Sequence, residues 1–545
     1  MSERAAIDIA LLQINPVMGD IDGNARRVAE AVERLRASAP FRVALLSELV
    51  LVGYPPDDLV LRPDLPELVE RALAWLAARL ATSGVAVVVG APVATADGLQ
   101  NAAVVLDGGE RLSSVGKRCL PNYGVFDEKR HFSPGEVAGT VTIDGRRLGI
   151  LVCEDLWSPE PAADLRAAGA EVLLCPNASP FHRQKPALRR TVAAQRCAET
   201  GLPVIYVNQF GGQDDLVFDG DSFALDAGGG EVLRLPACEA ASGVVRLQSD
   251  GRLAARGAAP APPPADETGA VYGALRLAVA DYIDKNGFAG VFVGLSGGID
   301  SALTLALAVD ALGPERVTAV LMPSRHTAPM SLEDAAAEAD TLGVQRLTLP
   351  IEGPYAAFLD CLAEPFSDRE PDVTEENLQA RCRGVLLMAL SNKYNRLVLS
   401  TGNKSEMAVG YATLYGDMAG GFAPLKDVPK TLVYELARWR NRQSHVIPTR
   451  TLERPPSAEL APDQLDTDNL PPYEELDPIL EALVERDDRV EDIVAAGHDE
   501  ETVRRVARML VRSEYKRRQA APGPKVTARA FGRERRYPIT SRYPF

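Results

Sequence analysis

The sequence predicts an α/β protein with at least two domains, and three observations lead there. First, 545 residues are too many for a single hydrophobic core. Second, short apolar runs of β-forming residues alternate with longer helix-like stretches, which is typical of sheets covered by helices. Third, residues 255–267 hold four prolines within five positions, which fit neither a helix nor a central strand. We therefore expect domains at 1–254 and 268–545, joined by a linker at 255–267.

The first half is predicted to build a sheet whose faces are covered. Its strand-like runs are apolar at nearly every position, as in strands that are buried on both sides. Helix-like stretches, expected at 25–38 and 65–82, separate several of these runs. The strands are expected at 7–12, 42–46, 85–90, 148–152, 171–174 and 204–208.

The second half is predicted to open with a βαβ unit. An amphipathic helix at 268–286 is followed by a buried strand at 290–295, a glycine-rich turn, a helix at 301–311 and a strand at 316–322. In a Rossmann-like, doubly wound parallel sheet, ligands bind at the carboxyl ends of the strands. The turn after the first strand is therefore a candidate ligand site.

Composition and charge narrow the class of protein. Apolar residues make up 46% and charged residues 25% of the chain, as in ordinary soluble enzymes. No apolar run approaches the roughly 20 residues of a membrane span and no signal peptide is visible, so we expect a cytoplasmic protein without a membrane partner. The net charge of −16 opposes binding to nucleic acid. Seven cysteines without a Cys-x-x-Cys pair and five scattered histidines predict neither disulfides nor a zinc site.

The turn at 294–301 has the chemistry of a phosphate-binding loop. Its two adjacent glycines let the backbone turn tightly and present N–H groups to phosphate oxygens, and the following helix adds its positive N-terminal end. Its serine hydroxyls can donate hydrogen bonds, and its aspartate can hold Mg²⁺ against the phosphates. The candidate ATP-binding residues are Gly294, Leu295, Ser296, Gly297, Gly298, Ile299, Asp300 and Ser301.

This loop lacks the lysine of a Walker A loop. It resembles the loop of the ATP pyrophosphatases, which split ATP to AMP and pyrophosphate by adenylating an acid. The resemblance implies ATP as a substrate and Mg²⁺ as a cofactor. That superfamily includes NAD, GMP, asparagine and argininosuccinate synthetases and several tRNA-modifying enzymes, and the loop alone does not choose among them.

Later segments of the second half resemble NAD synthetases in order and spacing. The resemblance implies that Thr401 contacts ATP and that Glu406 joins Asp300 in holding Mg²⁺. It further implies that Asn377, Glu406 and Lys516 contact deamido-NAD. The segments that carry the resemblance are 375–383, 399–406, 410–421, 429–431 and 455–460.

In the first half, Cys153 lies where an apolar strand is expected to end in an acidic turn, so its thiol can project into a cleft from a rigid support. Two segments precede it, 47–58 after a buried strand and then 115–130. Together they resemble the Glu-Lys-Cys amidases of the nitrilase superfamily over residues 1–250. The resemblance implies a nitrilase-like αββα sandwich, and it supplies the proximity of the three side chains, which their spacing does not show.

The resemblance also implies a role for each reactive residue. Glu48 is the general base, because a thiol with an unperturbed pKa of about 8.5 is mostly protonated at neutral pH. Lys117 stabilises the tetrahedral oxyanion, and Glu128 is a supporting glutamate. The catalytic glutamate follows Ser47, where the family usually has proline. The segment 177–185 resembles the branch that precedes NAD synthetases, which implies that glutamine is bound by Tyr123, Ser179 and Lys185.

The two resemblances together imply a glutamine-dependent NAD synthetase, in which ammonia from glutamine amidates deamido-NAD in an ATP-dependent reaction. They favour a homo-oligomer through the synthetase domains, and we expect an enclosed path for the ammonia. Two alternatives stay open. One is another glutamine-dependent adenylating synthetase, although asparagine synthetases use an N-terminal cysteine and position 2 here is serine. The other is a tRNA-modifying ATP pyrophosphatase, which the acidic charge opposes.

Overall fold

The computed structural model describes residues 5–136, 139–257, 266–462 and 464–543. The chain forms two compact units, an N-terminal unit of Met1–Gln213 with Val217–Ala270 and a C-terminal unit of Asp214–Leu216 with Val271–Phe545. Most of the predicted linker, residues 258–265, lies outside the described residues. Strand β15 (Leu253–Arg256) runs past the linker's predicted start, and helix α5 (Glu267–Lys285) begins at its predicted end. The domain boundaries stay a prediction.

Two mixed sheets build the N-terminal unit. The first contains β1 (Ile7–Gln13), β2 (Val43–Leu45), β3 (Ala86–Thr95), β4 (Gly98–Asp107), β5 (Glu110–Gly116), β14 (Ala241–Leu247) and β15. Its order is β15-β14-β1-β2-β3-β4-β5, with β1, β2 and β3 parallel and the other neighbours antiparallel.

The second sheet repeats this plan. It contains β6 (Gly139–Ile143), β7 (Arg146–Ile150), β8 (Val172–Asn177), β9 (Val204–Asn208), β12 (Phe223–Leu225) and β13 (Glu231–Arg234). Its order is β13-β12-β9-β8-β7-β6, with β7, β8 and β9 parallel and antiparallel strands at both edges. A two-stranded sheet of β10 (Phe210–Gln213) and β11 (Leu216–Asp219) follows β9.

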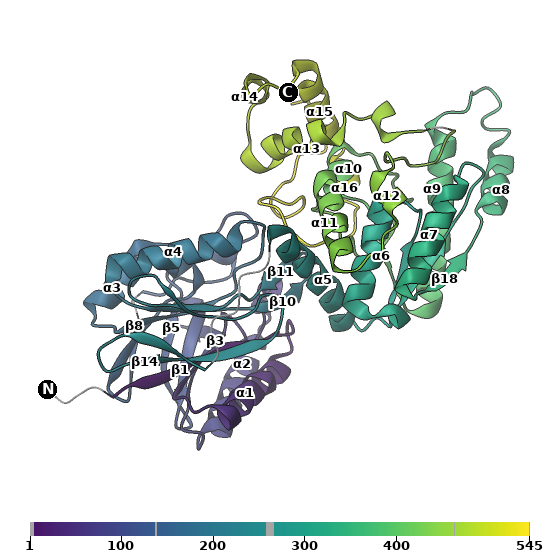
Figure 1. Cartoon of the computed structure of the whole chain (residues 1–545). Helices are drawn as coiled ribbons and strands as arrows, with labels where there is room; N and C mark the ends of the chain where they lie inside the picture. Colours follow the sequence, from purple (N-terminus) through teal and green to yellow (C-terminus); the bar gives the residue numbers. More distant parts are fainter. Residues whose placement is uncertain (1–4, 137–138, 258–265, 463, 544–545) are drawn as a thin grey trace. The chain divides into compact units, whose positions relative to one another are not determined.

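Along each strand, successive side chains point to opposite faces of the sheet, so neighbouring residues belong to different cores of this unit. Leu45 and Val88 of the first sheet and Leu174 of the second belong to one buried core between the sheets. Leu173 belongs to a second core, on the outer face of the second sheet, together with Cys197. Figure 1 shows helices on the two outer faces of this sandwich. They are α1 (Ile21–Ser38) and α2 (Leu65–Leu80) on the first sheet, and α3 (Pro159–Ala167) and α4 (Lys185–Thr200) on the second. The predicted αββα sandwich is confirmed.

A four-stranded sheet forms the centre of the C-terminal unit. It contains β16 (Val291–Gly294), β17 (Val317–Leu321), β18 (Gln345–Thr348) and β19 (Leu397–Leu399). All neighbours are parallel, in the order β18-β17-β16-β19. The chain moves outward from β16 to β18 and returns to the other side of β16 as β19. The carboxyl ends of β16 and β19 therefore flank a topological switch point, where ligands bind in sheets of this kind.

Helices surround this sheet, as the predicted Rossmann-like fold requires. Leu387 of α9 packs on the face that carries Phe292, Val320 and Val398. Around the sheet lie α6 (Ile299–Leu312), α7 (Pro329–Leu342), α8 (Glu352–Leu362), α9 (Val373–Tyr394) and α11 (Lys430–Gln443). The shorter helices are α10 (Lys404–Val409) and α12 (Thr449–Glu453), and a further group contains α13 (Tyr473–Glu481), α14 (Val490–Ala495), α15 (Glu500–Arg512) and α16 (Glu514–Arg517). None of the helices in the described ranges has the length and apolar character of a membrane span.

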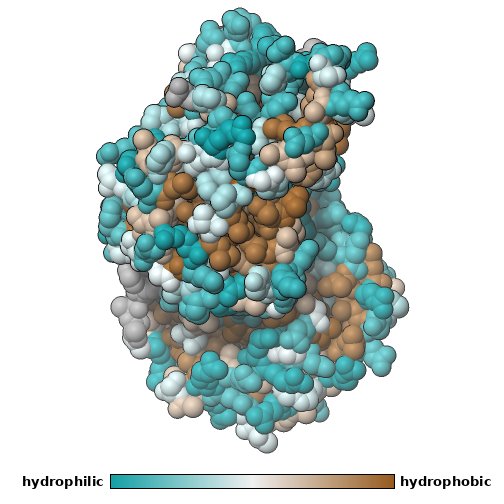
Figure 2. Space-filling model, turned by 90° about the vertical axis from the view of Figure 1, so that its right-hand side faces the viewer, coloured by the Kyte–Doolittle hydropathy of each residue, from teal (hydrophilic) through white to brown (hydrophobic). Residues whose placement is uncertain are grey.

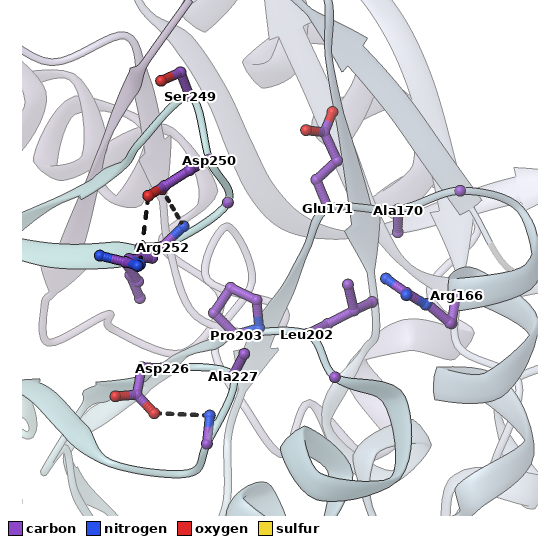
Figure 3. Close-up of a pocket in the computed structure, with 15 residues that line it drawn as sticks. Arg166, Ala170, Glu171, Leu202, Pro203, Asp226, Ala227, Ser249, Asp250 and Arg252 are labelled. Carbon is purple, nitrogen blue, oxygen red and sulfur yellow. Dashed lines mark hydrogen bonds and ion pairs between the residues drawn. The ribbon is translucent and has the colours of Figure 1, made fainter. Parts of the chain in front are cut away.

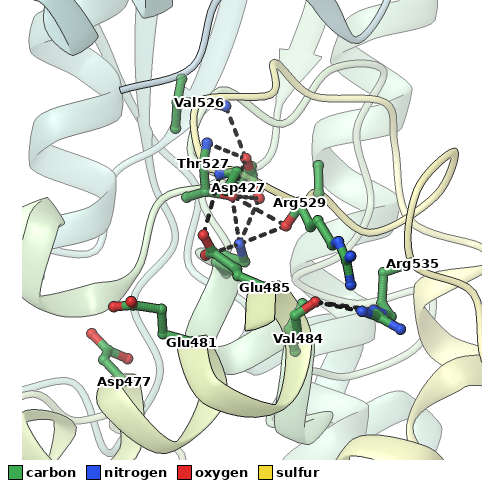
Figure 4. Close-up of polar contacts among 12 residues, drawn as sticks. Asp427, Asp477, Glu481, Val484, Glu485, Val526, Thr527, Arg529 and Arg535 are labelled. Carbon is green, nitrogen blue, oxygen red and sulfur yellow. Dashed lines mark hydrogen bonds and ion pairs between the residues drawn. The ribbon is translucent and has the colours of Figure 1, made fainter. Parts of the chain in front are cut away.

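The last part of the chain is bonded to the interior of the C-terminal unit (Figure 4). Asp427 accepts hydrogen bonds from the backbone N–H groups of Val526 and Thr527, both at 2.8 Å. Lys404, the first residue of α10, is buried, and its Nζ donates to Thr527 Oγ1 at 2.6 Å and to Glu485 Oε1 at 2.8 Å. These bonds fix the position of α10, which carries one of the predicted site residues.

Two candidate active sites

The candidate nucleophile Cys153 lies in a strained turn. It follows β7 and begins a 3₁₀ turn with a φ of 48°. Left-handed backbone at a residue other than glycine costs on the order of 1–3 kcal/mol and is concentrated at functional sites. Asp155 holds the turn, because its Oδ2 accepts from the N–H of Val152 at 3.0 Å and its Oδ1 accepts from the N–H of Cys119 at 2.7 Å. The turn that presents the thiol is thereby bonded to the segment that carries Lys117.

Glu48 is buried in the loop after β2, and both of its carboxylate oxygens accept hydrogen bonds. Oε1 accepts from Lys117 Nζ and from Asn101 Nδ2, both at 2.7 Å. Oε2 accepts from the N–H of Ala178 at 3.0 Å. Gly90 on β3 leaves room for this loop, because a Cβ there would lie 2.7 Å from the carbonyl carbon of Glu48.

Lys117 is fully buried between two carboxylates. Its Nζ lies 2.7 Å from Oε1 of Glu48 and 2.6 Å from Oε1 of Glu128. The Tyr54 hydroxyl also donates to Oε1 of Glu128 at 2.7 Å, whereas Oε2 of Glu128 has no hydrogen-bond partner among the described residues. Pairing on both sides offsets the cost of burying the ammonium. The structure thus brings Glu48, Lys117 and Glu128 into one hydrogen-bonded cluster.

Electrostatics keeps the thiol protonated and the lysine charged. Burial raises the pKa of Cys153 well above its usual range, and the charge of Glu48 raises it further, whereas Lys117 opposes this. Burial lowers the pKa of Lys117, but Glu128 and Glu48 outweigh burial, so this pKa is raised. Burial also raises the pKa of Glu128. The thiol therefore needs a base to remove its proton, and the two largest charge effects on its pKa come from Glu48 and Lys117, which were predicted to work with it.

The residues predicted to bind glutamine surround the same turn. The hydroxyl of Tyr123 donates to Oε1 of Glu154 at 2.9 Å, next to the nucleophile. Burial raises the pKa of Glu154, while the hydrogen bond from Tyr123 and the charge of Lys185 lower it. Ser179 is buried, and its Oγ accepts from Nε of Arg189 at 3.1 Å, so the hydroxyl hydrogen can be donated elsewhere.

Several residues of this site were not singled out from the sequence. Asn101, which binds Glu48, lies in the apolar strand β4, and a buried amide in such a run is the one signal that could have found it. Tyr54, which binds Glu128, has no local signal of this kind. Asp155 was visible only as part of an acidic turn.

A cavity of about 880 Å³ in the N-terminal unit lies away from this site (Figure 3). Glu171 and Pro203, which border it, directly precede β8 and β9. Asp250 and Arg252 border it from the hairpin between β14 and β15. Cys153 follows the carboxyl end of the parallel neighbour β7, at the opposite end of the sheet, so the cavity is separate from the candidate active site.

In the C-terminal unit the loop 294–301 leads from β16 into α6. Ser301 Oγ accepts from the N–H of Ser296 at 3.2 Å and lies 3.1 Å from its Oγ. Gly297 has a φ of 84°, and a Cβ there would lie 2.4 Å from the carbonyl oxygen of Ser331. The serines, which were expected to bind phosphate, also bond to each other and hold the shape of the loop.

The other predicted ATP contacts lie at the same edge of the sheet. Thr401 is partly buried and follows β19. Because β19 is a parallel neighbour of β16, Thr401 and the loop leave the sheet side by side. Leu295 and Ile299 are buried and anchor the loop.

Asp300 and Glu406, predicted to hold Mg²⁺, are bridged by a lysine. Nζ of Lys430 lies 2.5 Å from Oδ2 of Asp300 and 3.2 Å from Oε1 of Glu406. Asn403 donates from Nδ2 to Oδ1 of Asp300 at 2.8 Å and caps the helix that carries Glu406. Burial raises the pKa of Glu406 to about 8, while Lys430 lowers it. The sequence assigned no role to Lys430, whose partner Asp300 is 130 positions away.

The donor set suits Mg²⁺ only if the substrate adds ligands. Across the described ranges, no group of three or more His, Cys, Asp or Glu side chains is arranged to hold a metal ion. Asp300 and Glu406 offer two carboxylates, and an ammonium already lies between them as a cation would. Mg²⁺ is usually held by one or two carboxylates together with substrate phosphates. The pair therefore fits a metal that arrives with a nucleotide.

The two remaining predicted dinucleotide contacts meet at the segment after α10. Asn377 Oδ1 accepts from Thr413 Oγ1 at 2.8 Å. Lys516 Nζ donates to the carbonyl oxygens of Gly410 and Ala412, both at 2.7 Å. The structure brings both residues to one segment, and this segment directly follows the helix that carries the predicted metal-binding glutamate.

Comparisons with known proteins give a match for each half of the chain and for the chain as a whole. Residues 8–245 match the carbon-nitrogen hydrolase family and residues 271–520 match the NAD synthase family. The chain is 48% identical to the glutamine-dependent NAD(+) synthetase of Rhodobacter capsulatus, covering 98% of each chain, and 48% identical to that of Xanthomonas campestris pv. campestris, covering 98% of this chain and 97% of the relative. Among solved structures, the chain is similar to the glutamine-dependent NAD+ synthetase of Acinetobacter baumannii in complex with ADP. The two sequences are 43% identical, and the structures match with a TM-score of 0.79 over 98% of each chain. The chain therefore belongs to the family of glutamine-dependent NAD(+) synthetases.

Proposed function

We propose that this chain makes NAD from deamido-NAD, ATP and glutamine, and releases glutamate, AMP and pyrophosphate. The observation that carries the proposal is the similarity of the whole chain to synthetases of that name, at 48% identity. The hydrogen-bonded cluster beside Cys153 and the loop at the switch point support it, since each half contains side chains suited to one of the two reactions.

At the first site, Cys153 attacks the side-chain carbonyl carbon of glutamine. Glu48 takes the thiol proton and passes it to the departing ammonia, and Lys117 stabilises the oxyanion. Although Glu48 accepts three hydrogen bonds, a carboxylate has about four acceptor positions, so one remains for the proton. Water then hydrolyses the thioester to glutamate.

Recognition of glutamine is assigned to the residues around the turn. Lys185 would pair with the α-carboxylate, and Tyr123 and Ser179 would donate hydrogen bonds. Lys185 and Glu154 carry opposite charges close together, which matches the two charges of a free amino acid. This complementarity supports an amino acid rather than a simple amide as substrate.

At the second site, the nicotinate carboxylate attacks the α-phosphate of ATP and pyrophosphate leaves. The N–H groups of the loop 294–301 and the N-terminus of α6 bind the phosphates. Thr401 contacts ATP, and Asn377, Glu406 and Lys516 contact deamido-NAD. Asp300 and Glu406 would hold Mg²⁺, which neutralises phosphate charge when bound. Ammonia then displaces AMP to form the amide.

We also propose a homo-oligomer that forms through the C-terminal unit. Phe358 of α8 and Val385, Met388 and Tyr394 of α9 are exposed, although α9 is apolar on its covered side as well. Exposed apolar side chains that gather on neighbouring helices often mark a protein–protein interface. Figure 2 shows apolar side chains on the side of the molecule that carries α8 and α9 in Figure 1. The cytoplasmic location stays a prediction.

The direct test is NAD formation by the purified full chain from deamido-NAD and ATP, with either glutamine or ammonium as nitrogen source. We expect NAD from both sources, with AMP and pyrophosphate formed in equal amounts. Adenylation of a different acid would favour another glutamine-dependent synthetase. A tRNA gel shift together with no NAD would favour the tRNA-modifying alternative.

A further inference from the structure

The arrangement around Lys430 has consequences for metal binding. The side chain of this lysine is 2% exposed, and its ammonium lies within 2.5 Å of Asp300 and 3.2 Å of Glu406. It also lies 5.2 Å from the centre of the Tyr473 ring. The ammonium thus occupies the space between the two carboxylates, where a bridging metal ion would have to lie.

Charge explains why the ammonium is stable there. Asp300 and Glu406 each place a carboxylate oxygen within 3.2 Å of the ammonium, and this pairing on two sides offsets the cost of burying its charge. Without a cation, the two carboxylates would repel each other. Yet 17% of both Asp300 and Glu406 remains exposed, so an ion from solvent can reach them.

An ammonium and a divalent ion cannot share this position. Binding of the metal therefore requires Nζ of Lys430 to leave, and it then needs another anion. Asp300 belongs to the loop 294–301, so phosphates held by this loop lie within reach of the flexible lysine stem. ATP would supply the new partner for the lysine in the same step that brings the metal.

We propose that Lys430 is a built-in counter-ion, which excludes divalent metal from Asp300 and Glu406 until a nucleotide binds. The inference rests on the proposed function, because it assumes that these carboxylates serve an ATP site. Metal binding and nucleotide binding are then cooperative. The nucleotide phosphates draw the ammonium away from the metal position, and the metal ion neutralises the carboxylates that would repel the phosphates.

The experiment measures Mn²⁺ binding to the full chain by loss of the free-ion EPR signal, without substrates or turnover. Lys430→Met should bind Mn²⁺ at least about tenfold more tightly than the wild type, an ordinary size for a coupling between two ligands. Lys430→Arg keeps the cation and should behave as the wild type. α,β-Methylene-ATP should tighten Mn²⁺ binding more in the wild type than in Lys430→Met.

Two controls make the result specific. In the double variant Asp300→Asn with Lys430→Met, the gain in Mn²⁺ affinity should disappear, which assigns the ion to this site. If Lys430→Met melts early, Mn²⁺ should raise its melting temperature more than that of the wild type; if it is insoluble, Lys430→Gln replaces it. Equal Mn²⁺ affinity in wild type and variant, or no rescue by Mn²⁺, overturns the inference. Failure of the proposed function would appear separately, as absence of NAD.

Discussion

Both candidate sites place a buried lysine between two carboxylates, but the two sites differ in exposure. Around Lys117, the side chains of Glu48 and Glu128 are 0% and 4% exposed. Around Lys430, both carboxylate side chains are 17% exposed. The first lysine is closed off from ions in solvent, whereas the second can be replaced. The same pattern of charges thus suits a permanent cation in one unit and an exchangeable one in the other.

The largest expected effect tests the site around Lys117 and Cys153, which is closed to ions from solvent. Cys153→Ala should lower glutamine-dependent NAD synthesis by at least about a thousandfold, because removing one member of a catalytic group costs nearly as much as removing all. Synthesis from high ammonium should be preserved. Glu48→Gln should likewise lose synthesis from glutamine and keep synthesis from high ammonium. Normal activity of Cys153→Ala with glutamine would show that another group is the nucleophile.

The next effect tests whether Lys117 contributes more to the stability of the fold than Lys430 does. Lys117→Met leaves Glu48 and Glu128 buried without a cation, which should cost about 3–5 kcal/mol of stability. Lys430→Met should cost less, because water reaches its carboxylates. Urea unfolding followed by circular dichroism measures both, with the exposed Lys129→Met as control. Equal losses in the two variants would remove the distinction between the sites.

A smaller effect is expected when Asp300, a predicted metal ligand beside Lys430, is changed. Asp300→Asn should lower NAD synthesis from glutamine and from ammonium equally, by about a hundredfold, since metal stabilisation of phosphate charge is worth several kcal/mol. Pyrophosphate release without any amine follows adenylation alone. Unchanged release at limiting Mg²⁺ would exclude Asp300 from the metal site.

The smallest effect concerns a buried acid that forms no ion pair in the described structure. Oε1 of Glu338 has no hydrogen-bond partner among the described residues, and burial raises its pKa from 4.5 to about 8. The folded state therefore keeps this proton between the two values, and stability falls as the pH rises from 4.5 to 8. Glu338→Gln should remove that fall, so its stability should exceed that of the wild type by more at pH 8 than at pH 5. Thermal melts from pH 5 to 8 measure it, with the exposed Glu364→Gln as control, and parallel curves for wild type and Glu338→Gln would contradict it.

The fold could be predicted at several of the strands that are buried on both faces, although the buried strand β4 was not predicted. The predicted runs at 7–12, 85–90 and 204–208 correspond to β1, β3 and β9, which lie inside their sheets. The edge strands β5 and β18 were missed, because most of their residues are exposed and polar and therefore carry no apolar pattern. The first Rossmann-like βαβ unit, in contrast, was predicted nearly to the residue.

The site residues could be predicted from the sequence only where several functional residues lie close together in one short segment. The loop 294–301 is such a segment, and a resemblance supplied Glu48, Lys117 and Cys153. The sequence could not show that Lys430 meets Asp300, because that contact depends on how α11 packs against α6. Asn101 was missed for the same reason, since only tertiary packing brings it to Glu48.

The most direct test of the account follows one nitrogen atom through both sites. The full chain would convert deamido-NAD and ATP with glutamine labelled by ¹⁵N in its amide, in the presence of excess unlabelled ammonium, and the NAD would be analysed by mass spectrometry. We predict NAD that carries the label, because ammonia made at Cys153 should reach the adenylate before it exchanges with solvent. Unlabelled NAD would mean two independent enzymes on one chain, and absence of NAD would contradict the proposed function itself.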